Sequence, residues 1–182
     1  MKYVILIRGI NVGVKNRMSM EVLRKCLEEM GCSNVSTYIN SGNVILESGK
    51  SAQELKDQIE KALPKSFELS GLIKVLVLTR DKLQSVIDNK PKGFGEEPKN
   101  YYSDVIFLMD IDPVQAMSVF NPREGVDKIW PGKSVIYSQR LGSERTKSRL
   151  SKIVGTPAYK SMTIRTWNTT TKLLKMLKER EE

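Results

Sequence analysis

The chain has 182 residues, of which 40% are hydrophobic and 28% are charged, a balance typical of a folded globular protein that excludes extended disorder. It contains no histidine, so a histidine-based catalytic triad and the commonest metal ligand are both excluded. The formal net charge is +9, and most of the excess lies in residues 143–180, where ten basic residues are accompanied by two acidic ones.

In the first half of the chain, apolar patterns predict the order strand, helix, strand, strand, helix, strand. The two helices carry their apolar residues on one face, with Leu23 and Leu27 in the first and Leu55 and Ile59 in the second. Ser51 and Glu54 form a capping-box pattern that sets the start of the second helix. The predicted elements are strand 3–7, helix 20–30, strands 35–39 and 44–47, helix 52–67 and strand 73–78.

The second half is predicted to repeat much of this order. Residues 91–102 include prolines and glycines and show little apolar periodicity, which predicts a linker between a first domain, 1–90, and a second domain, 103–182. We expect two related split-βαβ units, and the first unit is a candidate packing partner for the closing helix. The predicted elements are strand 104–109, helix 113–120, strands 126–130 and 134–138, a basic helix 147–154 and the closing helix 167–177.

The first apolar run contains five residues and ends at Arg8, which is too short for a secretion signal or a membrane span. Cys26 and Cys32, the two cysteines of the chain, lack the spacing of a zinc site or a disulfide framework. We therefore expect a cytoplasmic protein with reduced cysteines, no metal site and no cofactor.

A polar loop follows the first predicted strand. Gly9 and Gly13 would let backbone N–H groups approach a ligand, while Arg8, Asn11 and Lys15 supply side-chain donors. The spacing matches neither the phosphate loop nor the dinucleotide-binding fingerprint. The alternative is a loop whose glycines only satisfy backbone geometry.

A second polar segment runs from Asn40 to Asn43 and is predicted first of all to be a hairpin turn, since Asn and Gly tolerate positive φ. Asn40 and Asn43 could also present their amides to a ligand. Ser41 has no histidine to activate it, so a nucleophilic role is not expected.

A third polar segment, residues 163–170, leads into the closing helix. Hydroxyl and amide groups at a helix start indicate either capping or anion binding, and Arg165 favours the second. Trp167 is a candidate for stacking on a base or for packing in the core.

The basic excess of the last third has two interpretations, a nucleic-acid surface and a solvated helix face. Recognition in the manner of the RNA-recognition motif is disfavoured, because strand 44–47 has no aromatic residue and strand 3–7 has only Tyr3. The residues of the proposed nucleic-acid patch are Lys147, Arg149, Lys172, Lys175 and Lys178.

Three segments together, residues 6–13, 37–44 and 163–169 with Lys172 and Leu173, resemble the bacterial domain-of-unknown-function family 1697. The resemblance extends over essentially the whole chain. It implies an α+β fold of two ferredoxin-like units (βαββαβ, the α-β plait) with antiparallel sheets and a C-terminal helix. It implies no established activity.

These patterns lead to one main hypothesis, a non-catalytic protein that binds a phosphate-bearing ligand, either a nucleotide or nucleic acid, in a polar cleft shared by the three segments. One alternative is a histidine-free enzyme acting on a phosphorylated or acyl substrate, with Arg8 and Arg165 stabilising charge and Lys15 as acid or base. Another is a protein-interaction module built on sheet edges. The expected ligand-binding residues are Arg8, Gly9, Asn11, Gly13, Lys15, Asn40, Ser41, Asn43, Arg165 and Asn168.

Overall fold

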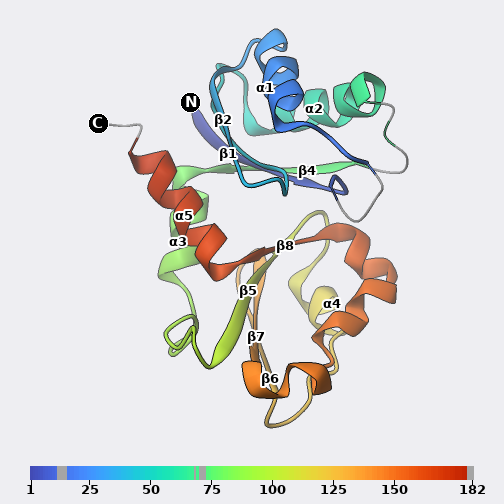
Figure 1. Cartoon of the computed structure of the whole chain (residues 1–182), viewed down its shortest axis with the longest axis vertical. Coiled ribbons are helices and arrows are strands. Elements are labelled where there is room, and N and C mark those ends of the chain that lie inside the picture. The colour runs from blue at the N-terminus through green and yellow to red at the C-terminus, as the bar shows by residue number, and fades with distance from the viewer. Residues whose placement is uncertain (12–15, 68, 70–72, 180–182) are drawn as a thin grey trace. The chain divides into compact units, whose positions relative to one another are not determined.

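The computed structural model describes residues 1–11, 16–67, 69 and 73–179, and within them it shows two four-stranded antiparallel sheets (Figure 1). The chain divides into two compact units. The first contains Met1–Gln84 together with the chain from Leu173, and the second contains Ser85–Lys172. The division falls inside two continuous helices, α3 (Arg80–Asp88) and α5 (Trp167–Lys178).

The first unit contains the six elements that the apolar patterns predict, in the predicted order. Its sheet has the strand order β2-β3-β1-β4, and every neighbouring pair is antiparallel. α3 follows β4 directly and was missed by the sequence analysis. The bounds are β1 (Lys2–Arg8), α1 (Met20–Glu29), β2 (Ser33–Tyr38), β3 (Asn43–Glu47), α2 (Ala52–Phe67) and β4 (Lys74–Thr79).

The core of the first unit lies between the sheet and its two helices. Successive strand residues point to opposite faces, so Tyr3, Ile5 and Ile7 share the face that packs against α1 and α2. The helices contribute the apolar stripes expected from their periodicity: Leu23 and Leu27 from α1, and Leu55, Ile59 and Leu63 from α2.

The start of α2 shows the predicted capping box. The Ser51 N–H donates to Glu54 Oε2 at 2.8 Å, and the Glu54 N–H donates to Ser51 Oγ at 3.3 Å. Each side chain thus accepts a hydrogen bond from the other residue's backbone.

The second unit has a sheet of order β6-β7-β5-β8, again antiparallel throughout. One face of this sheet carries Ile106, Leu108, Ile136 and Met162 and packs against α4 and the segment after β7. The bounds are β5 (Tyr101–Leu108), α4 (Pro113–Met117), β6 (Asp127–Pro131), β7 (Val135–Leu141), the 3₁₀ helices η1 (Gly142–Lys147), η2 (Leu150–Gly155) and η3 (Pro157–Ser161), and β8 (Met162–Thr166).

The predicted basic helix 147–154 is wrong, since these residues fall in η1, the junction after it and η2. Ser148 adopts an extended conformation, with ψ 144°, and ends η1. Thr156, which precedes Pro157, is also extended, with ψ 150°, as expected for a residue before proline. Ser148 therefore interrupts the predicted helix and Thr156 ends η2 just beyond it, so the segment forms short 3₁₀ helices.

β8 was also missed by the sequence analysis, which assigned residues 163–166 to a polar segment before the closing helix. In the structure Ile106 of β5 pairs with Ile164, and Val105 pairs with Arg165. The strand is only five residues long and three of them are polar, so pairing with β5 rather than local propensity defines it.

An aromatic cluster fills part of the second unit. Phe94, fully buried in the segment predicted as a linker, makes edge-to-face contacts with Trp130, Tyr137 and Trp167, with ring centroids 6.1, 5.2 and 5.3 Å apart. The Tyr137 hydroxyl donates to the Val86 carbonyl at 2.6 Å. Residues 91–100, which form turns and bends, therefore contribute a core side chain.

We predict that Gly95→Ala is much more destabilising than Gly93→Ala. Both glycines have positive φ, +75° and +81°, but a Cβ at Gly95 would collide with the Trp167 indole ring, while a Cβ at Gly93 would meet nothing within 4 Å. Left-handed backbone strain alone should cost about 1–2 kcal/mol, and the collision about 1–3 kcal/mol more. Urea unfolding followed by Trp fluorescence measures both variants, and equal losses would contradict the proposed Trp167 packing.

Asp127, at the start of β6, holds together two segments of the second unit. Its Oδ2 accepts the backbone N–H of Arg149 at 2.8 Å and that of Arg123 at 3.0 Å. Burial opposes ionisation of Asp127, but the Arg149 and Arg123 N–H donors outweigh it and hold the pKa of this carboxyl below its ordinary value.

We predict that the stabilising effect of Asp127 depends on pH. Its folded-state pKa is depressed, so the carboxylate contributes stability above the unfolded pKa of about 3.9, and this contribution is lost as pH falls through the folded pKa. Asp127→Asn should lower the free energy of unfolding by about 2 kcal/mol at neutral pH and by clearly less near pH 2. Urea unfolding of both proteins across this range measures the difference, and a constant difference would refute the ionic contribution.

Candidate functional site

The end of β1 and the turn between β2 and β3 lie against each other in the first unit. The Ile7 N–H donates to the Gly42 carbonyl at 2.8 Å. Gly42 has φ +71°, and a Cβ there would lie 2.7 Å from the Ile7 carbonyl oxygen, so the close approach requires glycine. The predicted turn at residues 40–43 is confirmed, and two of the three polar segments meet at this point.

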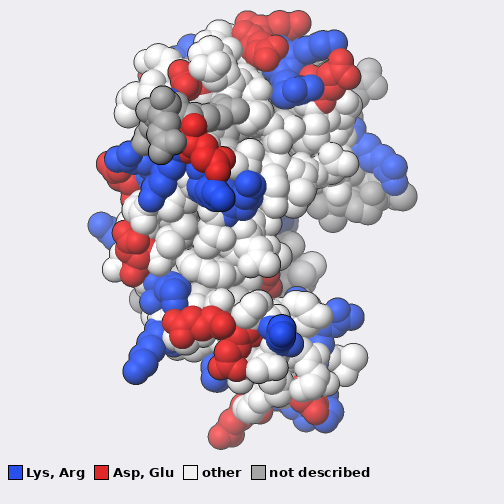
Figure 2. Space-filling model, turned by 60° about the vertical axis from the view of Figure 1, so that its left-hand side comes forward, with Lys and Arg blue, Asp and Glu red and all other residues white. Residues whose placement is uncertain are grey.

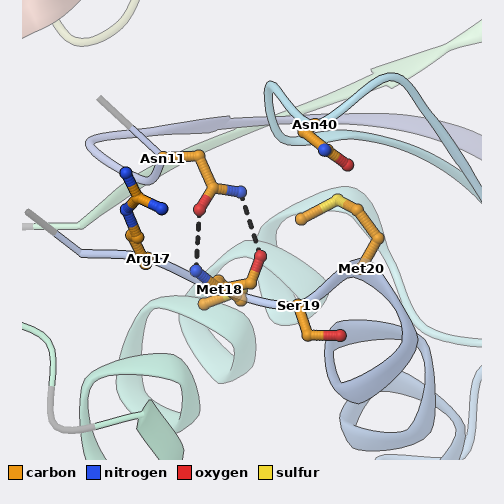
Figure 3. A pocket seen from close by; sticks show the side chains of 6 residues that line it. All are labelled: Asn11, Arg17, Met18, Ser19, Met20 and Asn40. Carbon is orange, nitrogen blue, oxygen red and sulfur yellow. Dashed lines mark hydrogen bonds between the residues drawn. The ribbon is translucent and has the colours of Figure 1, made fainter. Parts of the chain in front are cut away.

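Two asparagines shape the loop that follows β1. The Asn11 side chain donates to the Met18 carbonyl at 3.0 Å and accepts the Met18 N–H at 2.7 Å (Figure 3). The Asn16 amide donates to the Gly9 carbonyl at 2.8 Å. Gly9, Asn11 and Asn16 all have positive φ, which glycine and asparagine tolerate best. The described parts of this loop therefore have glycine or asparagine at the positions where the backbone adopts positive φ.

A pocket of about 530 Å³ opens between this loop, the start of α1 and the hairpin turn (Figure 3). Arg17 is exposed, as is Asn40 on the opposite wall. Among the described residues, the pocket is lined by Asn11, Arg17, Met18, Ser19, Met20 and Asn40.

The start of α1 makes the pocket favourable for an anion. Ser19 is the N-cap residue and is extended, with φ −66° and ψ 133°, but its side chain makes no capping hydrogen bond. The N–H groups of the first helical turn have no partner within the helix, and they carry the positive end of its dipole. Glu21, in the same turn, is paired with Lys25 at 3.0 Å, and this hydrogen bond lowers the pKa of its carboxyl.

The structure gives the predicted residues of the first unit different roles. Asn11 and Asn40 line the pocket. Asn43 is fully buried and donates to the Tyr38 carbonyl at 3.1 Å and to Ser41 Oγ at 2.8 Å, so its amide fixes the turn. Arg8 and Gly9 are half-buried at the end of β1, and Ser41 is exposed. Gly13 and Lys15 lie outside the described residues.

The third polar segment belongs to the second unit. Arg165 is buried, which lowers its pKa to about 10, and it donates to Thr163 Oγ1 at 2.9 Å and to the Ile164 carbonyl at 2.8 Å. Thr166 Oγ1 accepts the Thr169 N–H at 3.1 Å, so capping at the start of α5 is confirmed. Asn168 is exposed beside a second pocket. A cleft shared by all three segments stays a prediction.

The residues of the proposed nucleic-acid patch include ion-paired side chains. Lys147 pairs with Glu144 at 2.5 Å, and Lys175 pairs with Glu179 at 3.7 Å. The face drawn in Figure 2 shows basic and acidic side chains interspersed. Lys172, like Lys175 and Lys178, lies on α5, whereas the Arg149 backbone N–H binds Asp127. Nucleic-acid binding by these residues stays a prediction.

Several pocket residues were missed by the sequence analysis. Ser19 immediately precedes α1 and Arg17 lies two residues before Ser19, and a basic residue near a helix-start serine is a local signal for an anion site. In the second unit, Tyr101 and Tyr102 precede the apolar part of β5, where a pair of aromatics at a strand start could have been noticed. Within the described ranges no cluster of acidic or thiol groups could hold a metal ion, and no helix could cross a membrane.

The two four-stranded antiparallel sheets and the C-terminal helix define a mixed α+β protein. The chain belongs to the family described as "Protein of unknown function (DUF1697)", whose model matches residues 1–137. It is similar to a solved structure, the conserved bacterial protein SP0830 from Streptococcus pneumoniae, with a TM-score of 0.82 and 27% identity over 97% of this chain and 98% of that chain. No curated protein matches the chain significantly.

We predict that Asn11→Ala destabilises the first unit, whereas Asn40→Ala does not. Asn11 makes two hydrogen bonds to the Met18 backbone, and their loss should lower the free energy of unfolding by about 1–2 kcal/mol. Asn40 is exposed in a turn, and its truncation should stay within about 0.5 kcal/mol of the natural protein. Denaturant unfolding tests this, and equal stability of the two variants would show that Asn11 does not hold the loop.

Proposed function

We propose that the first unit binds a phosphate-bearing ligand, either a nucleotide or a nucleic-acid segment, in the pocket beside the start of α1. One observation carries this proposal: Arg17, the start of α1, which has no side-chain cap from Ser19, and the Asn40 amide border the same pocket. Binding of a phosphate group requires hydrogen-bond donors and positive charge, and it does not require a catalytic residue.

The chemistry of the walls supports an anionic group more than an apolar one. Arg17 supplies a permanent positive charge and several N–H donors in a fixed arrangement. Met20, which is half-buried, supplies flexible apolar surface that could contact the rest of the ligand, whereas Met18 is buried in the core. The net charge of +9 would favour encounter with phosphates at low salt.

We further propose that both units are variants of the ferredoxin-like plait. Their sheets have equivalent strand orders, β2-β3-β1-β4 and β6-β7-β5-β8, and in each the third strand pairs with the first. In the second unit the turns η1, η2 and η3 occupy the place in the chain that α2 has in the first. In this interpretation the two units share one topology and differ in that 3₁₀ helices replace an α-helix in the second unit.

We predict that Arg17→Ala weakens the binding of inorganic pyrophosphate by about tenfold or more, because a charge-assisted hydrogen bond contributes about 1.5–3 kcal/mol. Isothermal titration calorimetry at low and moderate salt measures the affinity of the natural protein and the variant. The matched control is Arg24→Ala, which removes the same charge from an exposed position on α1 outside the pocket lining.

The control should bind pyrophosphate as the natural protein does. If both arginine variants lose affinity equally, the attraction is a general effect of net charge and the pocket is not the site. If the natural protein does not bind pyrophosphate even at low salt, the proposed function is wrong.

A further inference from the structure

A second pocket, in the second unit, lies where one sheet face changes from apolar to polar. Tyr102 and Asp104 are two residues apart on β5, so they share the face that carries Ile106 and Leu108 further along. The register places Arg140 opposite Tyr102 and Thr166 opposite Asp104, which puts all four polar or aromatic side chains on this face. The apolar end is covered by α4 and η2, and the polar end forms one side of the pocket, whose lining also includes Tyr101 and Ser103 from the opposite face of β5.

The pocket has a volume of about 270 Å³ and lies at the point where β8 ends and α5 begins. β5 pairs with β8 only from Asp104 onward, so residues 101–103 extend past the end of that strand. The lining residues are Gly95, Pro98, Tyr101, Tyr102, Ser103, Asp104, Arg140, Thr166, Trp167 and Asn168.

Asp104 and Arg140 face this pocket with hydrogen-bonding capacity to spare. Arg140 Nη2 lies 3.9 Å from Asp104 Oδ2, close to the longest distance at which the two groups count as an ion pair. Only 20% of the Asp104 side chain is exposed, and burial raises the pKa of its carboxyl although Arg140 opposes this. Arg140 Nε is buried and has no hydrogen-bond partner among the described residues. Underused buried polar groups in a pocket indicate a ligand that pairs with them.

The walls of the pocket suit a flat ring. Tyr102 is 48% exposed, and its ring lies near two guanidinium groups, with centroid distances of 5.7 Å to Arg140 and 5.8 Å to Arg145. Tyr101 and Trp167 add further aromatic surface. A planar base can stack on an exposed aromatic ring or on a guanidinium plane.

We propose that this pocket binds a guanine base through Asp104, Arg140 and Tyr102. The Asp104 carboxylate accepts the two neighbouring donors of guanine, N1–H and the 2-amino group, while Arg140 donates to O6 or N7 and Tyr102 stacks on the ring. O6 is attached to C6, the ring atom bonded to N1, so the partners of O6 and N1–H must also be neighbours, as Asp104 and Arg140 are. This inference does not rest on the phosphate site of the first unit.

The other common bases fit this pair of groups less well. A carboxylate that approaches adenine or cytosine meets one amino group beside an acceptor. On uracil it meets one N–H between two acceptors. Guanine alone among them presents two adjacent donors next to an acceptor. An acceptor-only carboxylate beside an arginine therefore selects guanine by its hydrogen-bonding edge.

The test compares GMP, IMP and AMP by calorimetry, with the natural protein, Asp104→Asn and the control Glu124→Gln. IMP lacks only the 2-amino group, so the natural protein should bind it about tenfold more weakly than GMP, and AMP more weakly still. Asp104→Asn should weaken GMP to the level of IMP, because an amide presents only one acceptor oxygen. Glu124→Gln, an exposed change of the same charge, should leave all three affinities unchanged.

Further arms separate the possible sources of the base and the two proposed sites. Tighter binding of a guanine-containing tetranucleotide than of guanosine would assign the pocket to RNA, and equal binding would assign it to a free nucleoside or nucleotide. Arg17→Ala should leave guanosine binding unchanged. Equal affinities for GMP, IMP and AMP would overturn the proposal, as would the absence of guanosine binding up to about 1 mM by the folded protein.

Discussion

Each unit has a central strand, β1 or β5, that pairs antiparallel with a neighbour on both sides. The remaining structure depends on this pairing. Pairing on both edges fixes the register, and the register decides which side chains share a face. It also decides where strands end. The two pockets lie at such ends, one beyond β1 and one beside the start of β5, where β5 pairs with β7 but extends past the end of β8.

Polar side chains in this protein divide into those whose hydrogen bonds maintain the fold and those that remain available at a pocket. Asn43 in the first unit and Asp127 in the second bind backbone groups and hold turns in place. Asn40 and Asp104 carry the same amide and carboxylate groups but border pockets. Sequence alone cannot separate the two groups, because an amide or a carboxylate has the same identity in either role. The separation depends on which backbone groups come within hydrogen-bonding distance.

The sequence predicted the regular elements of the first unit well. The long apolar stripes of α1 and α2 and the strands rich in β-branched residues carry strong periodic signals. It failed at residues 147–154, where apolar and basic residues suggested one helix, but the extended Ser148 ends η1 and a separate 3₁₀ helix, η2, follows. It also failed at β8, whose existence depends on pairing with β5. The candidate site was only partly predicted: Asn11 and Asn40 were included, but Arg17 was not.

By itself, the sequence determined the mixture of helices and strands, the hairpin turn at Gly42 and the family to which the chain belongs, since these follow from local periodicity, turn chemistry and short motifs. Only the tertiary structure decided that the loop after β1 meets that turn beside Arg17, and that Asp104 and Arg140 face one pocket. The physical reason is that strand register joins residues distant in the chain, and register is set by the packing of a whole sheet rather than by any one segment.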